Sequence, residues 1–178
     1  MKNGVNVSEI KILIVDDSAT KRALYKGVLE REGYKIIEAG DGEEGLSKTK
    51  TEFPDIILAD LAMPKMDGFK MIELVKADEN GKFIPVICVS ATYKDIENKV
   101  KALIEAGAEE FFYMPEKIDE LLIKVRVMIR IRKIYLELLE KNKQLQIFNK
   151  AAVDRELKMV DLKDKIRNLE EEIKRYKR

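Results

Sequence analysis

Two apolar segments of strand length each end in carboxylates. Residues 56–59 are followed by Asp60, and residues 10–15 are followed by Asp16 and Asp17. A continuous apolar run of this length is typical of a strand buried on both faces of a parallel sheet. A carboxylate directly after such a run lies at the carboxyl end of its strand, where open α/β sheets keep their ligand crevice. Asp60 is therefore a candidate nucleophile.

Three carboxylates in one crevice repel one another strongly unless a cation joins them. We expect Mg²⁺ there, because it takes oxygen ligands, keeps several waters and pairs with phosphate oxygens. Phosphoryl transfer needs little beyond an in-line nucleophile, such a metal and a few donors. Asp60 could attack a phosphorus atom and form an acyl phosphate. The alternative is that each acid only caps a helix, which is common for one acid and less so for three together.

The segments around these acids alternate between strands and helices. Besides the two acid-bearing strands, we predict strands at about residues 34–39, 85–90 and 111–113. Helices are predicted at about residues 19–32, 42–52, 69–77 and 96–106. Five strands alternating with helices indicate an α/β fold with a parallel sheet covered on both faces. These patterns leave the strand order open.

Apolar spacing also predicts which residues of two helices point inward. The first helix has three apolar residues on its expected inner side: Leu24, Val28 and Leu29. The helix near residue 100 has four apolar residues at helical spacing: Ile96, Val100, Leu103 and Ile104.

Composition narrows the function classes. A chain of 178 residues has room for one ordinary α/β domain plus an appendage. The net charge of +1, with 38% charged residues, indicates no polyanionic partner. Histidine is absent, which excludes histidine metal sites, Ser-His-Asp triads and a phosphohistidine on this chain. Cys88 lies in an apolar run, so we expect a small core residue.

No apolar run is long enough to span a bilayer, and the first residues lack the apolar core of a signal peptide. We therefore expect a cytoplasmic protein with no membrane partner.

The last part of the chain has a different character. Residues 116–178 contain no Gly or Pro, so a single helix of about 95 Å is possible at 1.5 Å per residue. From Ile131 the apolar spacing becomes heptad, with twelve of fourteen seam positions apolar. The a positions are Ile131, Leu138, Leu145, Ala152, Met159, Ile166 and Ile173, and the d positions are Ile134, Lys141, Phe148, Arg155, Leu162, Leu169 and Tyr176.

This seam predicts a coiled coil that makes a homodimer through residues 131–178. Two favourable pairs between g and e positions, Lys165 with Glu170 and Glu172 with Lys177, favour a parallel arrangement, while antiparallel and higher-order assemblies remain open. Basic residues of this segment are dispersed around the helix. A basic DNA-binding region is therefore not predicted, and we expect no direct contact with nucleic acid.

Four motifs in chain order carry a resemblance to a known family. They are ILIVDD at 12–17, PDIILADLAMPKMDG at 54–68, PVICVSA at 85–91 and GAEEFFYMP at 107–115. As an ordered set they closely resemble the receiver domain of two-component response regulators, over roughly residues 10–130. The resemblance implies a flavodoxin-like, five-stranded doubly wound sheet with strand order 2-1-3-4-5.

The resemblance also implies a site and a switch. Phosphorylation would occur on Asp60, with a histidine kinase as partner. Mg²⁺ would be held by Asp16, Asp17, Asp60 and the backbone carbonyl of Ala62. In the switch, the hydroxyl of Ser90 would turn toward the phosphoryl group and the aromatic ring of Phe111 would repack inward.

One position departs from the family's pattern. The family has a lysine before the proline of the last motif, and this chain has Met114 there. A lysine would pair its ammonium with a phosphoryl oxygen, whereas a thioether offers neither charge nor donor. Lys65 or Lys117 could reach the site from a neighbouring loop instead. By the resemblance, Met114 and Pro115 are joined by a cis peptide bond.

We therefore predict a receiver domain at residues 1–130, followed by a coiled-coil helix at 131–178 that extends the fifth helix. The predicted function is that of a response regulator phosphorylated on Asp60, which signals through a dimeric coiled coil to a downstream effector protein. Met114 leaves a phosphorylation-independent adaptor or dimerisation module as the alternative. Apart from Mg²⁺-dependent gain and loss of its own phosphoryl group, no enzyme activity and no organic cofactor are predicted.

Overall fold

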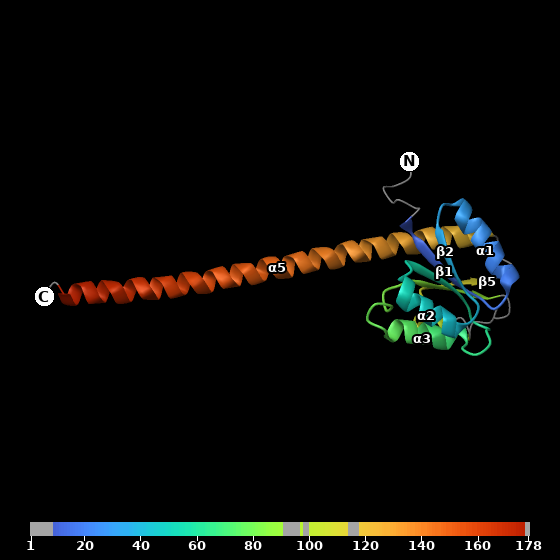
Figure 1. Cartoon of the computed structure of the whole chain (residues 1–178), viewed down its shortest axis with the longest axis horizontal. Helices are drawn as coiled ribbons and strands as arrows, with labels where there is room; N and C mark the ends of the chain where they lie inside the picture. The colour runs from blue at the N-terminus through green and yellow to red at the C-terminus, as the bar shows by residue number, and fades with distance from the viewer. Residues whose placement is uncertain (1–8, 91–96, 98–99, 114–117, 177–178) are drawn as a thin grey trace. The chain divides into compact units, whose positions relative to one another are not determined.

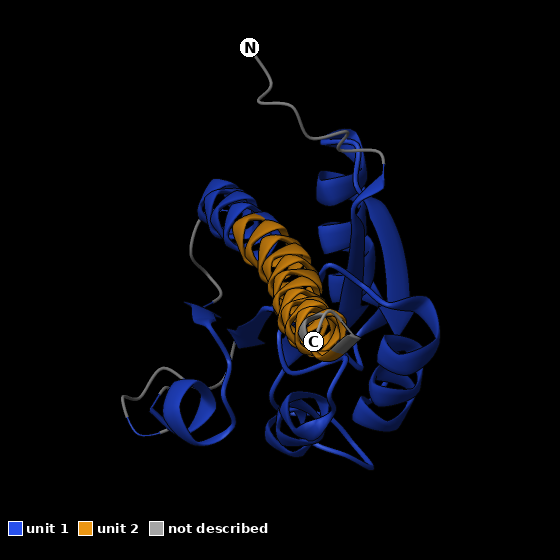
Figure 2. Cartoon of the chain, turned by 90° about the vertical axis from the view of Figure 1, so that its left-hand side faces the viewer, with its two compact units in different colours: residues 1–133 blue, residues 134–178 orange. Residues whose placement is uncertain are grey.

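The computed structural model describes residues 9–90, 97, 100–113 and 118–176 (Figure 1). The chain divides into two units, residues 1–133 and residues 134–178 (Figure 2). The first unit contains the sheet, and the described part of the second is helical throughout. Within the described residues, no helix combines the length and the apolar character that a membrane crossing needs.

Five parallel strands form one sheet in the order β2-β1-β3-β4-β5, which confirms the predicted fold class and strand order. The strands are β1 (Lys11–Val15), β2 (Lys35–Ala39), β3 (Ile56–Asp60), β4 (Val86–Ser90) and β5 (Glu110–Tyr113). Every residue of β3 and β4 is buried. Continuous burial is expected of central parallel strands, because helices cover both of their faces.

Two layers of helices cover the sheet. The elements are α1 (Ala19–Arg31), α2 (Gly42–Glu52), α3 (Gly68–Ala77), the π-helical turn η2 (Lys101–Glu105) and α5 (Ile118–Tyr176). On one face, α1 and the first turns of α5 bury apolar side chains against Ile12, Ile14 and Leu58. On the other face, α2, α3 and η2 pack against Leu13, Val15 and the other strand residues whose side chains point to that face. Successive residues of a strand point to opposite faces of the sheet.

The predicted inner faces of two helices were right at Leu29, which is buried, and at Leu103, which packs partly buried against the core, but wrong at other positions. In α1, Leu24 is 48% exposed, and Tyr25 is buried with Leu29 in its place. Tyr25 and Leu29 are four residues apart on the helix, so they share the face that meets the sheet.

Near residue 100, Ile104 is 75% exposed and Val100 is also exposed, while the buried residues are Ala102 and Ala106. The amide of Ala106 donates to the carbonyl of Lys101, five residues back, at 3.0 Å. This wider π-type turn rotates the following side chains away from the positions that α-helical spacing predicts. Ile96 lies outside the described residues.

Cys88 lies within β4 and its side chain is a buried free thiol, as predicted. Burial raises the pKa of this thiol to about 12. A thiol that stays protonated and has no access to solvent is a packing group without redox or nucleophilic reactivity.

Candidate functional site

Three carboxylates meet at the carboxyl ends of the neighbouring strands β1 and β3. One ligand oxygen from each of Asp16, Asp17 and Asp60 lies within 4.8 Å of the other two. Asp16 and Asp60 are buried and Asp17 is exposed. Parallel pairing of β1 with β3 produces this cluster. Val15 lies opposite Ala59, and each of these two residues is followed directly by an acid, Asp16 or Asp60.

Backbone amides bind one oxygen of each buried acid. The N–H of Ser18 donates to Asp16 Oδ1 at 2.8 Å, and the N–H of Ala62 donates to Asp60 Oδ1 at 3.2 Å. The second oxygen of Asp16, Oδ2, is buried and makes no hydrogen bond within the described part of the chain. A buried oxygen without a hydrogen bond, beside two further carboxylates, fits a hard divalent cation such as Mg²⁺.

A lysine that the sequence analysis did not single out lies in this cluster. The Nζ atom of Lys21 is 2.5 Å from Asp60 Oδ2 and 3.3 Å from Asp16 Oδ2. Lys21 lies in the first turn of α1, where its N–H donates to the capping hydroxyl of Ser18 at 3.4 Å. The helix dipole disfavours a cation in a first turn. That position was the signal in the sequence that could have indicated nearby acids.

Burial and neighbouring charges both shift the pKa values of Asp16 and Lys21. Burial raises the pKa of Asp16 to about 6; the N–H of Ser18 lowers it and the charge of Asp60 raises it. Partial burial lowers the pKa of Lys21, but its hydrogen bond to Asp60 and the charges of Asp60 and Asp16 outweigh this, so the net shift is upward. The ammonium of Lys21 pairs with the two buried carboxylates, and Asp17 adds a third negative charge, so the three carboxylates outnumber the ammonium.

The other predicted site residues lie near this edge of the sheet or outside the described part. Ser90 is buried at the end of β4, one residue beyond the pairing of Asp60 with Val89. Phe111 is buried in the core, so its ring already lies inside in this structure. Ala62 is exposed, two residues after Asp60.

Of the two lysines proposed from the sequence as substitutes, only Lys65 lies within the described residues. Lys65 forms an ion pair with Asp41. Lys117, Met114 and the peptide bond between Met114 and Pro115 lie outside the described residues.

Gly68, the first residue of α3, packs against the strand end that carries Asp60. A Cβ atom at this position would lie 2.1 Å from the carbonyl oxygen of Asp60 and 2.8 Å from Leu61 Cα. We expect Gly68→Ala to lower the free energy of unfolding by about 2–3 kcal/mol, because backbone rather than a flexible side chain must move. Urea unfolding followed by tyrosine fluorescence measures this change.

Gly27 provides a matched control for that substitution. It lies inside α1, and a Cβ atom there would have no neighbour within 4 Å. Gly27→Ala should raise the free energy of unfolding by about 0.5–1 kcal/mol, since alanine favours the helix. Similar effects of the two substitutions would contradict the contact between Gly68 and the strand end.

Comparison with known proteins agrees with this geometry. The pattern of the response regulator receiver domain matches residues 12–126. The alkaline phosphatase synthesis transcriptional regulatory protein PhoP of Bacillus subtilis is 35% identical over 120 residues, which are 67% of this chain and 48% of that protein. The transcriptional regulatory protein ResD of the same organism is 37% identical over 123 residues, or 69% of this chain and 49% of that protein. The chain spans about half the length of the curated relatives it matches.

Solved structures show the same fold. A response regulator of Chloroflexus aurantiacus, described as putative, is 30% identical, with a TM-score of 0.64 over 68% of this chain and 98% of that one. The chemotaxis protein CheY4 of Vibrio cholerae is 30% identical, with a TM-score of 0.63 over 67% of this chain and 98% of that one.

Proposed function

The chain belongs to the response regulator receiver family, and from this premise we propose that Asp60 accepts a phosphoryl group from a partner histidine kinase in the cytoplasm. The observation that carries this proposal is the buried carboxylate of Asp60, clustered with Asp16 and Asp17 within 4.8 Å at the ends of adjacent strands. Receiver domains are signalling domains, and in this proposal the chain's own chemistry is limited to gaining and losing that group.

In the proposed reaction, a carboxylate oxygen of Asp60 attacks the phosphorus atom of the kinase's phosphohistidine. The P–N bond breaks, its electron pair returns to the imidazole of the kinase, and an acyl phosphate forms on Asp60. Asp16, Asp17, Asp60 and the carbonyl of Ala62 would hold Mg²⁺, which when bound neutralises charge on the phosphoryl oxygens. The hydroxyl of Ser90 would donate to the phosphoryl group, and Phe111 would respond by its packing in the core.

Intact mass spectrometry tests this proposal directly. After incubation with a small-molecule acyl phosphate and Mg²⁺, the protein should gain the mass of one phosphoryl group, and it should not do so without Mg²⁺. If the mass does not increase under conditions that label an ordinary receiver, the result would favour the alternative, a phosphorylation-independent adaptor. This alternative is based on Met114, which replaces the lysine of the family's pattern.

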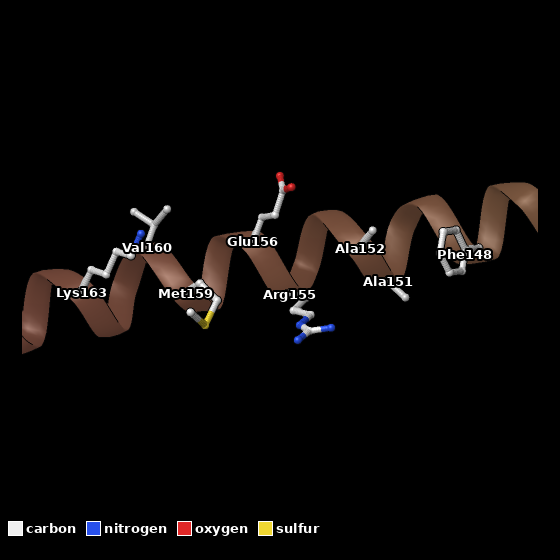
Figure 3. A pocket seen from close by; sticks show the side chains of 8 residues that line it. All are labelled: Phe148, Ala151, Ala152, Arg155, Glu156, Met159, Val160 and Lys163. Carbon is white, nitrogen blue, oxygen red and sulfur yellow. The ribbon is translucent and has the colours of Figure 1, made fainter.

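For the output, we propose that residues 1–130 act as the receiver and that residues 131–178 form a homodimeric coiled coil. In the single chain the large apolar residues of the seam are exposed, among them Leu138, Leu145 and Phe148. Figure 3 shows small side chains, Ala151 and Ala152, beside Phe148 on this helix, where they line a hollow. Apolar knobs and such holes are what a facing helix packs against in a coiled coil.

We further propose that phosphorylation changes the packing or twist of α5 and that the helix carries this change to a downstream effector. Leu138→Cys, at an a position, should crosslink between copies with a yield that differs with and without beryllofluoride as phosphate mimic. The native Cys88 gives little background, because burial raises the pKa of its thiol to about 12.

Lys143→Cys, on the outer side of the predicted coil, is the matched control and should crosslink poorly in both states. An unchanged yield for Leu138→Cys on addition of the mimic would contradict the proposed transmission.

A further inference from the structure

The remaining oxygens of the two buried acids face a cation that belongs to the chain itself. The Oδ1 atoms of Asp16 and Asp60 accept backbone N–H groups, whereas their Oδ2 atoms lie 3.3 and 2.5 Å from Lys21 Nζ. The ammonium of Lys21 therefore contacts the same pair of oxygens that the backbone leaves open.

A metal ion bound to these oxygens would need the volume that the ammonium occupies. Mg²⁺ approaches carboxylate oxygens to about 2.1 Å and tolerates little departure from octahedral geometry. An Nζ atom 2.5 Å from one Oδ2 and 3.3 Å from the other lies where such an ion would be placed. Two cations in one small site also repel each other strongly. Occupancy by the ammonium and by the ion should therefore be mutually exclusive.

We propose that Lys21 is a built-in counter-ion of the acid cluster that competes with Mg²⁺, so that the ion binds only by displacing the ammonium. This inference rests on the proposed function of Asp60 and adds a regulatory element to its site. The side chain of Lys21 is 32% exposed, and its flexible stem can carry the ammonium into water without unfolding α1. The competition weakens Mg²⁺ binding and makes phosphoryl acceptance depend on the concentration of the ion.

Isothermal titration of Mg²⁺ into wild-type protein and Lys21→Met tests the competition. Methionine keeps the unbranched apolar stem and removes the charge. We expect Lys21→Met to bind Mg²⁺ about tenfold more tightly than wild type, because no ammonium has to be displaced. Lys21→Arg keeps a competing cation and should bind Mg²⁺ weakly, as wild type does.

Thermal unfolding gives a second readout. Without Mg²⁺, Lys21→Met should unfold at a lower temperature than wild type, since the buried carboxylates of Asp16 and Asp60 have lost their paired ammonium. Saturating Mg²⁺ should raise the unfolding temperature of Lys21→Met by more than that of wild type.

Lys26→Met is the matched control. Lys26 lies on the same helix, and its Nζ atom is 2.8 Å from Glu38, outside the acid cluster. The substitution changes the net charge equally but should leave the affinity for Mg²⁺ near that of wild type. Equal tightening in both variants would show a general charge effect and overturn the inference. Wild-type or weaker affinity in Lys21→Met, or no Mg²⁺ binding by this variant, would also overturn it.

Phosphorylation plays no part in these measurements. The competition between Lys21 and Mg²⁺ and the phosphorylation of Asp60 can therefore be tested independently. If Lys21→Met binds Mg²⁺ as wild type does while Asp60 still gains a phosphoryl group, the competition is wrong and the proposed function stands. If the variant binds Mg²⁺ more tightly but the wild-type mass does not change with acyl phosphate, the competition stands and phosphoryl acceptance does not.

Discussion

Asp60→Asn should fold and yet gain no phosphoryl group from a small-molecule acyl phosphate. The amide keeps the shape of the side chain and an oxygen that can still accept the N–H of Ala62, a contact of 3.2 Å in the wild type. It removes the negative charge and the nucleophilic carboxylate oxygen that form the acyl phosphate. We expect labelling to fall below about 1% of the wild-type level in intact mass spectra, because the substitution removes the carboxylate that accepts the phosphoryl group in the proposed reaction.

Asp55→Asn, at the beginning of the same strand segment, controls for the effect of the substitution itself. The carboxylate of Asp55 accepts the N–H of Lys11 at 2.9 Å and has no place in the acid cluster. This variant should be labelled as the wild type is. Labelling that persists in Asp60→Asn would identify another acceptor, whereas equal loss in both variants would indicate damage to the fold.

Leu145→Glu should convert the proposed dimer into a monomer. Leu145 occupies an a position near the centre of the predicted seam and is 59% exposed in the single chain. In a dimer, the two introduced carboxylates would lie next to each other inside the seam, and Lys141 at the preceding d position would offset only part of the cost of burying and crowding these charges. We expect the dissociation constant to rise by at least about a hundredfold, and sedimentation equilibrium measures it.

Leu157→Glu separates the seam from the rest of the helix surface. Leu157 is 64% exposed on the same helix but lies at an f position, away from the predicted partner. The substitution is chemically identical, and the exposures in the single chain are similar. The heptad register is therefore the reason to expect a different dissociation constant for Leu145→Glu and Leu157→Glu. Loss of the dimer in both variants would place the interface on another face, and loss in neither would show that association does not use this seam.

The apolar runs of the sequence are sufficient to predict the sheet and the meeting of its acids. Residues 56–59 and 12–15 are continuously apolar, and such segments stay buried in most arrangements of an α/β fold. Because the strands are parallel, acids that follow them arrive at one edge of the sheet, as Asp16 and Asp60 do. The strand order came from the resemblance to a family, since the local pattern of a strand does not specify its neighbours.

The inner faces of α1 and η2 were decided by tertiary packing. Both Leu24 and Tyr25 are apolar enough to be buried, and the orientation of α1 on the sheet places Tyr25 inside. At η2, the π-type turn that ends at Ala106 changes the angular spacing of side chains, so Ile104 turns outward. Neither orientation follows from the residues of the helix alone.

The sequence by itself determined the acids at the strand ends, the apolar seam after Ile131 and the departure at Met114. Only the tertiary structure decided which cationic side chain forms ion pairs with Asp16 and Asp60. The ion pair between Lys21 and Asp60 joins residues 39 positions apart, from the first turn of α1 to the end of β3. Hydrophobic periodicity describes neighbours along one element and carries no signal for a contact between elements. The fold itself therefore had to bring this ammonium to the carboxylates.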